Sequence, residues 1–156
     1  MPLNFLSVLR RFPKISLSTA LILFLASALT AQDAVYFKCR WTGDYIYCQA
    51  KQPGQNATSN AYVNLSLAKT LWFIERVDDI WVRLRTKDSL YLHVENGKLD
   101  ASNVPPAFFS SQWKLPVTDG HNLIINRWTG VYINFEAHDL QASPGQPGWW
   151  SAQWSM

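Results

Sequence analysis

Two glutamates stand at the same place in two similar stretches of the chain and are the first candidates for chemistry. Glu95 ends the stretch Tyr-Leu-His-Val-Glu, and Glu136 ends Tyr-Ile-Asn-Phe-Glu. Two carboxylates can hydrolyse a glycosidic bond when they lie about 5–10 Å apart across it. If the two stretches belong to separate repeats of a symmetric domain, however, their equivalent residues lie on different sides of that domain. We therefore expect these glutamates to form cross-strand pairs with Arg85 and Arg127, and not a catalytic pair.

Other residues that could do chemistry are too scattered to indicate a site. The histidines are His93, His121 and His138, and no two of them have metal-ligand spacing on one element. The chain has no Gly-x-Ser-x-Gly motif and no glycine-rich phosphate loop. We expect a protein without enzymatic activity, metal site or cofactor.

The aromatic residues are better candidates, for binding. The stretches AFFSSQW and GWWSAQW end at Trp113 and Trp154. Alternate residues of an extended strand face opposite sides, so Trp149 and Phe108 point outward if the final tryptophans point inward. The second aromatic of each pair is then expected in the core. An exposed ring beside polar side chains suits stacking against the C–H face of a sugar.

Four further side chains complete the predicted ligand-binding set. Trp128 and Trp41 lie in equivalent Trp-Thr-Gly stretches. Asn134 and His93 occupy the same position of two predicted strands, where they could donate or accept hydrogen bonds. The alternative is that Trp149 packs against a neighbouring hairpin and that the polar pair only decorates the surface.

The segments that hold these residues recur with a period of about forty residues. Trp72, Trp113 and Trp154 are spaced 41 residues apart. Upstream, RWTGDYI (40–46) and RWTGVYI (127–133) agree at six of seven positions, and RTKDSLYL (85–92) is a longer copy. Short alternating apolar runs between turn residues indicate strands and no helices.

Three units of this length, each with several short strands, predict an all-β domain of the β-trefoil type. In this fold a closed six-stranded barrel is capped by three hairpins. A β-propeller has units of similar length, but three blades are too few to close a ring. We expect the trefoil over residues 34–156, with repeats 34–77, 78–119 and 120–156 and one core shared by the three tryptophans.

The two cysteines, Cys39 and Cys48, flank a predicted hairpin. A two-residue turn at Gly43-Asp44 would place them directly opposite each other. In an oxidising compartment that geometry predicts a cross-strand disulfide. Two free buried thiols are the alternative.

The first residues predict export. Arg10, Arg11 and Lys14 precede an apolar run over 15–29 and small residues near position 31, as in a signal peptide covering 1–31. An uncleaved anchor is the alternative, although the run is short for a membrane span. Cleavage would remove three of 14 Lys and Arg and none of 11 Asp and Glu, leaving no formal net charge. The absence of excess positive charge excludes a nucleic-acid-binding function. The signal peptide predicts a secreted or periplasmic protein.

The threefold period and the Gln-Trp at the repeat ends resemble the ricin-type β-trefoil lectins over essentially all of 34–156. The resemblance implies a non-catalytic module that binds carbohydrate or a glycoconjugate. Those lectins typically have Gln-x-Trp, whereas Gln112 and Gln153 directly precede Trp here, and no Asp-Gly-x-Cys stretch supplies a sugar-binding aspartate. The chain also resembles bacterial secreted proteins whose repeats end in Gly-Trp-Trp-Ser-Ala-Gln-Trp.

A protein-binding trefoil is the alternative function, either a protease inhibitor or the cell-attachment subunit of a toxin. The longest irregular insertion, QPGQNATSNAYVN (52–64), could project toward a protein partner. Two glycosylation sequons begin at Asn56 and Asn64 in the same region.

Overall fold

The computed structural model describes residues 33–50 and 61–156, which belong to a compact unit spanning Gln32–Met156. The predicted signal peptide over 1–31 and residues 51–60 of the predicted insertion, with the sequon at Asn56, lie outside the described residues. No helix within the described ranges is long and apolar enough to cross a bilayer.

Short strands joined by tight turns make up the described unit, in keeping with the all-β prediction. Two single-turn 3₁₀ helices, η1 and η2, interrupt the strands. The elements are β1 (Ala34–Val35), β2 (Lys38–Cys39), β3 (Tyr45–Ala50), β4 (Ala61–Ser66), β5 (Trp72–Arg76), β6 (Val82–Arg85), β7 (Tyr91–Glu95), β8 (Lys98–Ser102), η1 (Phe109–Ser111), β9 (Trp113–Lys114), β10 (Val117–Thr118), β11 (His121–Asn122), β12 (Ile125–Asn126), β13 (Tyr132–Glu136), β14 (Asp139–Ser143), η2 (Trp150–Ala152) and β15 (Trp154–Ser155).

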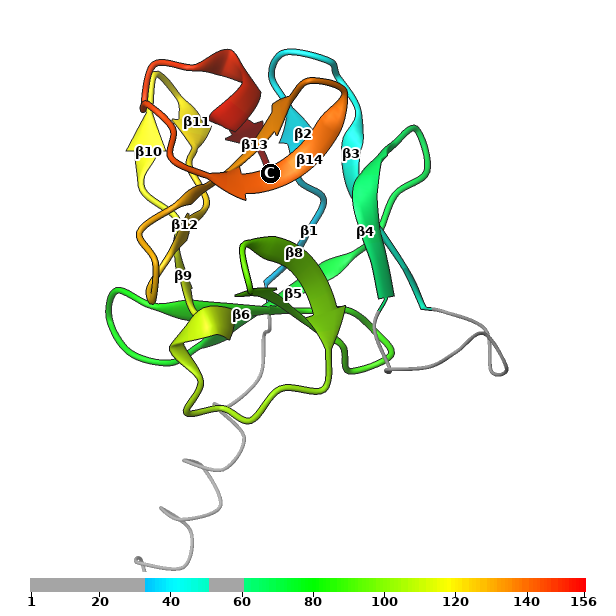
Figure 1. Ribbon diagram of the computed structural model, residues 1–156, viewed down its shortest axis with the longest axis vertical. Helices are drawn as coiled ribbons and strands as arrows, with labels where there is room; N and C mark the ends of the chain where they lie inside the picture. Colours follow the sequence, from blue (N-terminus) through cyan, green and yellow to red (C-terminus); the bar gives the residue numbers. More distant parts are fainter. Residues whose placement is uncertain (1–32, 51–60) are drawn as a thin grey trace, which may run out of the picture. The chain divides into compact units, whose positions relative to one another are not determined.

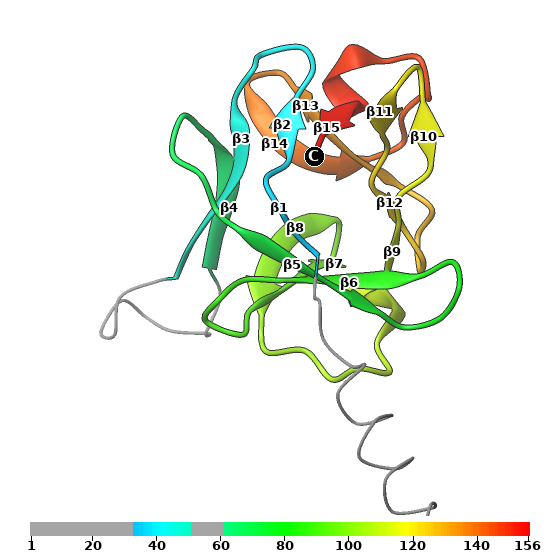
Figure 2. The same ribbon diagram turned by 180° about the vertical axis from the view of Figure 1, so that it is seen from behind.

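Antiparallel pairing closes a barrel. Going round it, β1 pairs with β5, β5 with β6, β6 with β9, β9 with β12, β11 with β15, and β15 with β2. β1 and β2 follow each other along the chain as parts of one segment, and so do β11 and β12. These two links join the paired strands, so the circuit returns to its start (Figure 2). A closed circuit leaves no free strand edge for pairing with another chain.

Three hairpins cover one end of the barrel. They are β3–β4, β7–β8 and β13–β14, and their second strands β4, β8 and β14 contact one another (Figure 1). Each hairpin comes from a different predicted repeat. The barrel with three hairpins is the arrangement that the forty-residue period predicted.

Three tryptophans fill the shared core, as the repeat predicted. Trp72, Trp113 and Trp154 are completely buried in one apolar cluster. Each buried indole N–H donates to a backbone carbonyl, and the acceptors hold equivalent positions in the repeats: Ile46 (3.2 Å), Leu92 (2.9 Å) and Ile133 (3.1 Å). Since a buried donor without a partner is costly, these bonds fix both the depth and the orientation of each ring.

The predicted disulfide is absent, because the hairpin register differs from the expected one. Cys39 donates its N–H to the Asp44 carbonyl (2.8 Å) and accepts from the Gly43 N–H (2.9 Å), so residues 40–43 form a four-residue turn. Gly43 has a φ of +78°, which favours glycine at the end of this turn. Cys48 lies opposite Val63 in the next hairpin, and both cysteines are free.

Candidate functional site

Two clefts with equivalent linings lie at junctions between repeats. We call the first, with a volume of about 430 Å³, the tryptophan cleft; the second, of about 410 Å³, is the phenylalanine cleft. The tryptophan cleft is lined by Trp41, Glu136, Trp149, Trp150 and Ser151. The phenylalanine cleft is lined by Glu95, Asn96, Ala107, Phe108, Phe109, Ser110 and Trp128.

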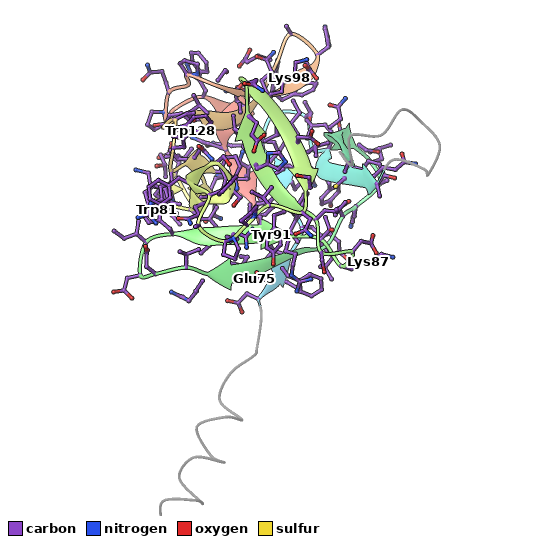
Figure 3. All side chains as sticks on the ribbon, turned by 60° about the horizontal axis from the view of Figure 1, so that its bottom comes forward. Glu75, Trp81, Lys87, Tyr91, Lys98 and Trp128 are labelled. Carbon is purple, nitrogen blue, oxygen red and sulfur yellow. The ribbon has the colours of Figure 1, made fainter. Side chains whose placement is uncertain are left out.

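Each cleft is built from three places in the fold. A capping hairpin supplies the glutamate at the end of its first strand, β13 or β7. The 3₁₀ turn that follows, η2 or η1, supplies the serine and the aromatic pair. The third wall comes from the Trp-Thr-Gly turn of another repeat, so Trp41 closes a cleft of the third repeat and Trp128 closes a cleft of the second. Trp128 lies along the same side of the domain as Trp81 (Figure 3).

The predicted exposure of Trp149 and Phe108 is observed, and the predicted burial of their neighbours is wrong. All six aromatic residues of the two clefts are between 44% and 61% exposed. Alternation along an extended strand would bury one member of each pair, but residues 150–152 and 109–111 turn as 3₁₀ helices. In this turn both members of a pair can project to the surface.

A buried glutamine and an arginine hold the aromatic wall of the tryptophan cleft. Gln153 is completely buried; its Nε2 donates to the Pro147 carbonyl (2.8 Å), and its Oε1 accepts a hydrogen bond from Arg40 Nη1. The Arg40 guanidinium lies 4.5 Å from the ring centre of Trp150. The arginine thus joins the turn of the first repeat to the end of the third and supports the indole.

The phenylalanine cleft has the same support. Gln112 Nε2 donates to the Pro106 carbonyl (2.9 Å), and its Oε1 accepts from Arg127 Nη1 (2.7 Å). The Arg127 guanidinium lies 4.3 Å from the ring centre of Phe109 and also meets Asp78 at 3.3 Å.

The predicted cross-strand pairs between arginines and glutamates are therefore wrong. Arg127 reaches Gln112 and Asp78 instead of Glu136, and Arg85 pairs with Glu75 instead of Glu95. Arg127 lies in the turn after β12, from which it reaches the preceding repeat, whereas Arg85 ends β6 and reaches Glu75 on the paired strand β5. Sequence reasoning missed these supports, although the arginine before each Trp-Thr-Gly was a usable clue.

The glutamates instead face the clefts. Glu136 Oε1 accepts a hydrogen bond from the Ser151 hydroxyl (2.6 Å), which fixes the carboxylate at the edge of the tryptophan cleft. The side chain of Glu95 is half exposed, and its Oε1 lies 3.9 Å from His93 Nδ1. Each glutamate lines a separate cleft, and neither cleft contains both.

His93 and Asn134 do occupy equivalent positions, but they point inward. They are 4% and 0% exposed, and each bonds a serine of the neighbouring strand: His93 Nε2 with Ser102 Oγ at 2.8 Å, Asn134 Nδ2 to Ser143 Oγ at 2.9 Å. Burial lowers the pKa of His93 below its usual value. Neither residue lines the two aromatic clefts.

The third junction, between the first and second repeats, is built differently. The positions equivalent to the aromatic pair are Leu67 and Ala68, and Thr86 replaces the turn tryptophan. Leu71 takes the place of the buried glutamine, and Arg85 accordingly turns to Glu75. Glu75 also accepts a hydrogen bond from the Tyr91 hydroxyl (3.0 Å), and both residues are labelled in Figure 3. The described residues therefore present an aromatic cleft at two of the three junctions.

Known structures share this architecture. The chain aligns over 78% of its length with a designed threefold-symmetric protein, ThreeFoil, at a TM-score of 0.62, 17% identity and 95% coverage of that protein. The fold is a β-trefoil. SeviL, bound to asialo-GM1 saccharide, aligns with 80% of the chain at a TM-score of 0.60 and 14% identity, again over 95% of SeviL.

A third structure is larger than this trefoil. It is a GlcNAcα1-4Gal-releasing endo-β-galactosidase from Clostridium perfringens, which aligns with 78% of the chain at a TM-score of 0.64 and 22% identity. The chain spans 31% of that enzyme's length. No family model and no curated protein matches the sequence. At these identities the likeness establishes the trefoil fold.

Proposed function

We propose that the protein is an exported, non-catalytic module that binds carbohydrate or a glycoconjugate through its tryptophan and phenylalanine clefts. The observation that supports it best is the repetition of one constellation at two junctions: three exposed aromatic rings, a carboxylate and a serine. Exposed aromatic clusters of this kind are unfavourable in water unless a ligand covers them.

Carbohydrate fits this chemistry better than a purely apolar ligand does. Sugar rings have C–H faces that pack on indole and phenyl rings, and hydroxyls that need acceptors. In the tryptophan cleft, Glu136 supplies a carboxylate beside the rings of Trp41, Trp149 and Trp150. Among the similar structures, SeviL is bound to a saccharide and the clostridial enzyme acts on a galactoside, which supports the same class of ligand.

Glycan-array binding, followed by titration calorimetry on the best ligand, tests the proposal. Trp149→Ala removes a wall of the tryptophan cleft and Phe108→Ala removes the equivalent wall of the phenylalanine cleft. Each lost ring contact should weaken its cleft about tenfold, so the double variant should bind about tenfold more weakly at both clefts. The matched control is Tyr36→Ala, an exposed aromatic residue outside both clefts, which should bind like the wild type.

The outcomes separate the possibilities. Absence of glycan binding by the folded wild-type protein would sink the proposal, as would unchanged binding by the double variant. Stoichiometric inhibition in a protease titration would instead support the protein-binding alternative. Export is tested separately: we expect the protein outside the cytoplasm, with a mass that shows the loss of residues 1–31.

A further inference from the structure

The two aromatic clefts share one electrostatic property. Among the described side chains that line the tryptophan cleft, Glu136 is the one that ionises, and Glu95 is its counterpart in the phenylalanine cleft. Each cleft therefore presents a negative charge bordered by aromatic rings. Ring faces carry negative potential, so rings and carboxylate favour the same sign of ligand charge.

The three repeats provide an internal comparison for this carboxylate. At the junction of the first and second repeats the equivalent position is Gln49, and there Leu67 and Ala68 replace the aromatic pair and Thr86 replaces the turn tryptophan. The carboxylate is present where the rings are present and absent where they are absent. In the described part of the chain, the arginines expected to pair with Glu95 and Glu136 bond other groups: Arg85 bonds Glu75, and Arg127 bonds Gln112.

The hydrogen bonding of the tryptophan cleft points to a ligand that donates. The Ser151 hydroxyl donates a hydrogen bond to Glu136 Oε1, which orients the carboxylate, while Oε2 accepts no hydrogen bond from the described residues and can accept one from a ligand. Besides the indole N–H groups, the lining residues offer no other side-chain donor to a ligand. A positively charged ammonium group both donates hydrogen bonds and is attracted by the rings and the carboxylate.

Arg40 places a positive charge beside the tryptophan cleft but does not line it. Its guanidinium stacks on Trp150 and bonds Gln153, and it is not among the lining residues of the cleft. One ring of the three is therefore already engaged with a cation. Trp41 and Trp149 remain, and we expect Glu136 to contribute more to charge selection than the rings do.

We propose that the two clefts select glycans that contain protonated amino sugars, such as glucosamine units with a free amine. This inference rests on the proposed carbohydrate function and narrows it. The sugar's C–H face stacks on the exposed rings while its ammonium group meets the carboxylate at the edge of the cleft. An N-acetylated sugar of the same shape can stack but cannot form the ion pair.

Calorimetry with two matched oligosaccharides tests the inference. The probes are glucosamine oligomers and N-acetylglucosamine oligomers of equal length and linkage, at mildly acidic pH but above the ordinary glutamate pKa of about 4.3. We expect the amine form to bind about tenfold more tightly. Added salt should reduce that preference while leaving the binding of the acetylated form nearly unchanged.

The decisive variant is Glu95→Gln with Glu136→Gln, which keeps the shape of both clefts and removes their charge. Its preference for the amine form should fall to about threefold or less, the part due to the rings. The matched control is Asp79→Asn with Asp119→Asn, which removes two surface charges outside the clefts and should keep the full preference.

Equal affinity for the two oligomers, or a preference that survives in the double Gln variant, would overturn the inference. If both oligomers bind equally and Trp149→Ala weakens both, the carbohydrate function stands and only the charge selection fails. If neither oligomer nor any glycan of the array binds, the function itself fails. Binding of choline without binding of the amine oligomer would also overturn the assignment to a sugar.

Discussion

The buried glutamine behind the tryptophan cleft gives the sharpest stability prediction. Gln153→Leu replaces the side chain by an apolar one of similar size, which is what the first repeat has at Leu71. The substitution removes the hydrogen bond to the Pro147 carbonyl and the one from Arg40. We expect the protein to fold with a lower free energy of unfolding and a looser tryptophan cleft.

The magnitude follows from the two bonds. A neutral hydrogen bond such as the one to Pro147 contributes about 0.5–1.5 kcal/mol, and a bond to a charged group about 1.5–3 kcal/mol. Leucine regains a little by burying apolar surface. The net cost should be about 2–4 kcal/mol, a large part of the total stability of a small domain, which is about 5–15 kcal/mol. Gln112→Leu should cost less, because Arg127 keeps Asp78 as a second partner.

Urea unfolding provides the measurement, with the midpoint shifting at constant slope. Gln49→Leu is the matched control, since it makes the same change at an exposed residue and should stay within about 0.5 kcal/mol of the wild type. Binding is the second readout: Gln153→Leu should weaken the tryptophan cleft and spare the phenylalanine cleft. A destabilisation below about 1 kcal/mol, or equal losses for Gln153→Leu and Gln49→Leu, would refute the reasoning.

Three further predictions follow from other parts of the domain. Cys39 is buried, and burial raises the pKa of the Cys48 thiol to about 12. A thiol reagent at pH 8 should therefore label neither cysteine until the protein is unfolded. Failure to label the unfolded protein in the absence of reductant would indicate a disulfide. Because burial lowers the pKa of His93, the unfolded state binds protons more readily, and the free energy of unfolding should fall as pH drops below about 6.5. In unfolding measured as a function of pH, His93→Asn should reduce this dependence on pH. An unchanged dependence would contradict the prediction. Ala137 and His138 form a two-residue turn with φ of +51° and +65°, so replacing them by Asn-Gly, the turn of the preceding repeat, should raise the free energy of unfolding by about 1–2 kcal/mol, and a loss in urea unfolding would contradict it.

The sequence predicts the trefoil because its period is visible at the buried tryptophans. The spacing of Trp72, Trp113 and Trp154 identified the core, and the acceptors of their indole N–H groups are residues that the repeat alignment placed at the same position of each repeat. These features depend on local spacing within each repeat, so a single chain is sufficient to reveal them.

Register and turn type were less predictable. Gly43-Asp44 resembles a two-residue turn, yet the chain forms a four-residue turn ending at Gly43, and the shift separates Cys39 from Cys48. The prediction that Trp150 is buried was wrong for a related reason, because side-chain alternation applies to strands and not to a 3₁₀ turn. Both errors arise where one residue more or less per turn changes which side a side chain faces.

Contacts between repeats were the hardest to predict. The bond from Arg40 to Gln153 joins residues 113 positions apart, and nothing local to either residue indicates it. Only the closure of the barrel brings the first repeat against the third. The clefts lie at these junctions, which explains why the sequence predicted their aromatic residues but not how three of them come together.

Seven of the eight tryptophans fall into two populations, with the half-buried Trp81 between them, and this division makes the domain its own spectroscopic probe. Trp72, Trp113 and Trp154 are sealed from water, whereas the indoles of both clefts are open to it. The sealed group emits at shorter wavelengths and is shielded from dissolved quenchers, so its emission reports unfolding. The open group is quenched readily and is covered when a ligand docks, so its emission reports occupancy. One unlabelled sample can therefore follow folding and ligand capture in separate regions of the same spectrum.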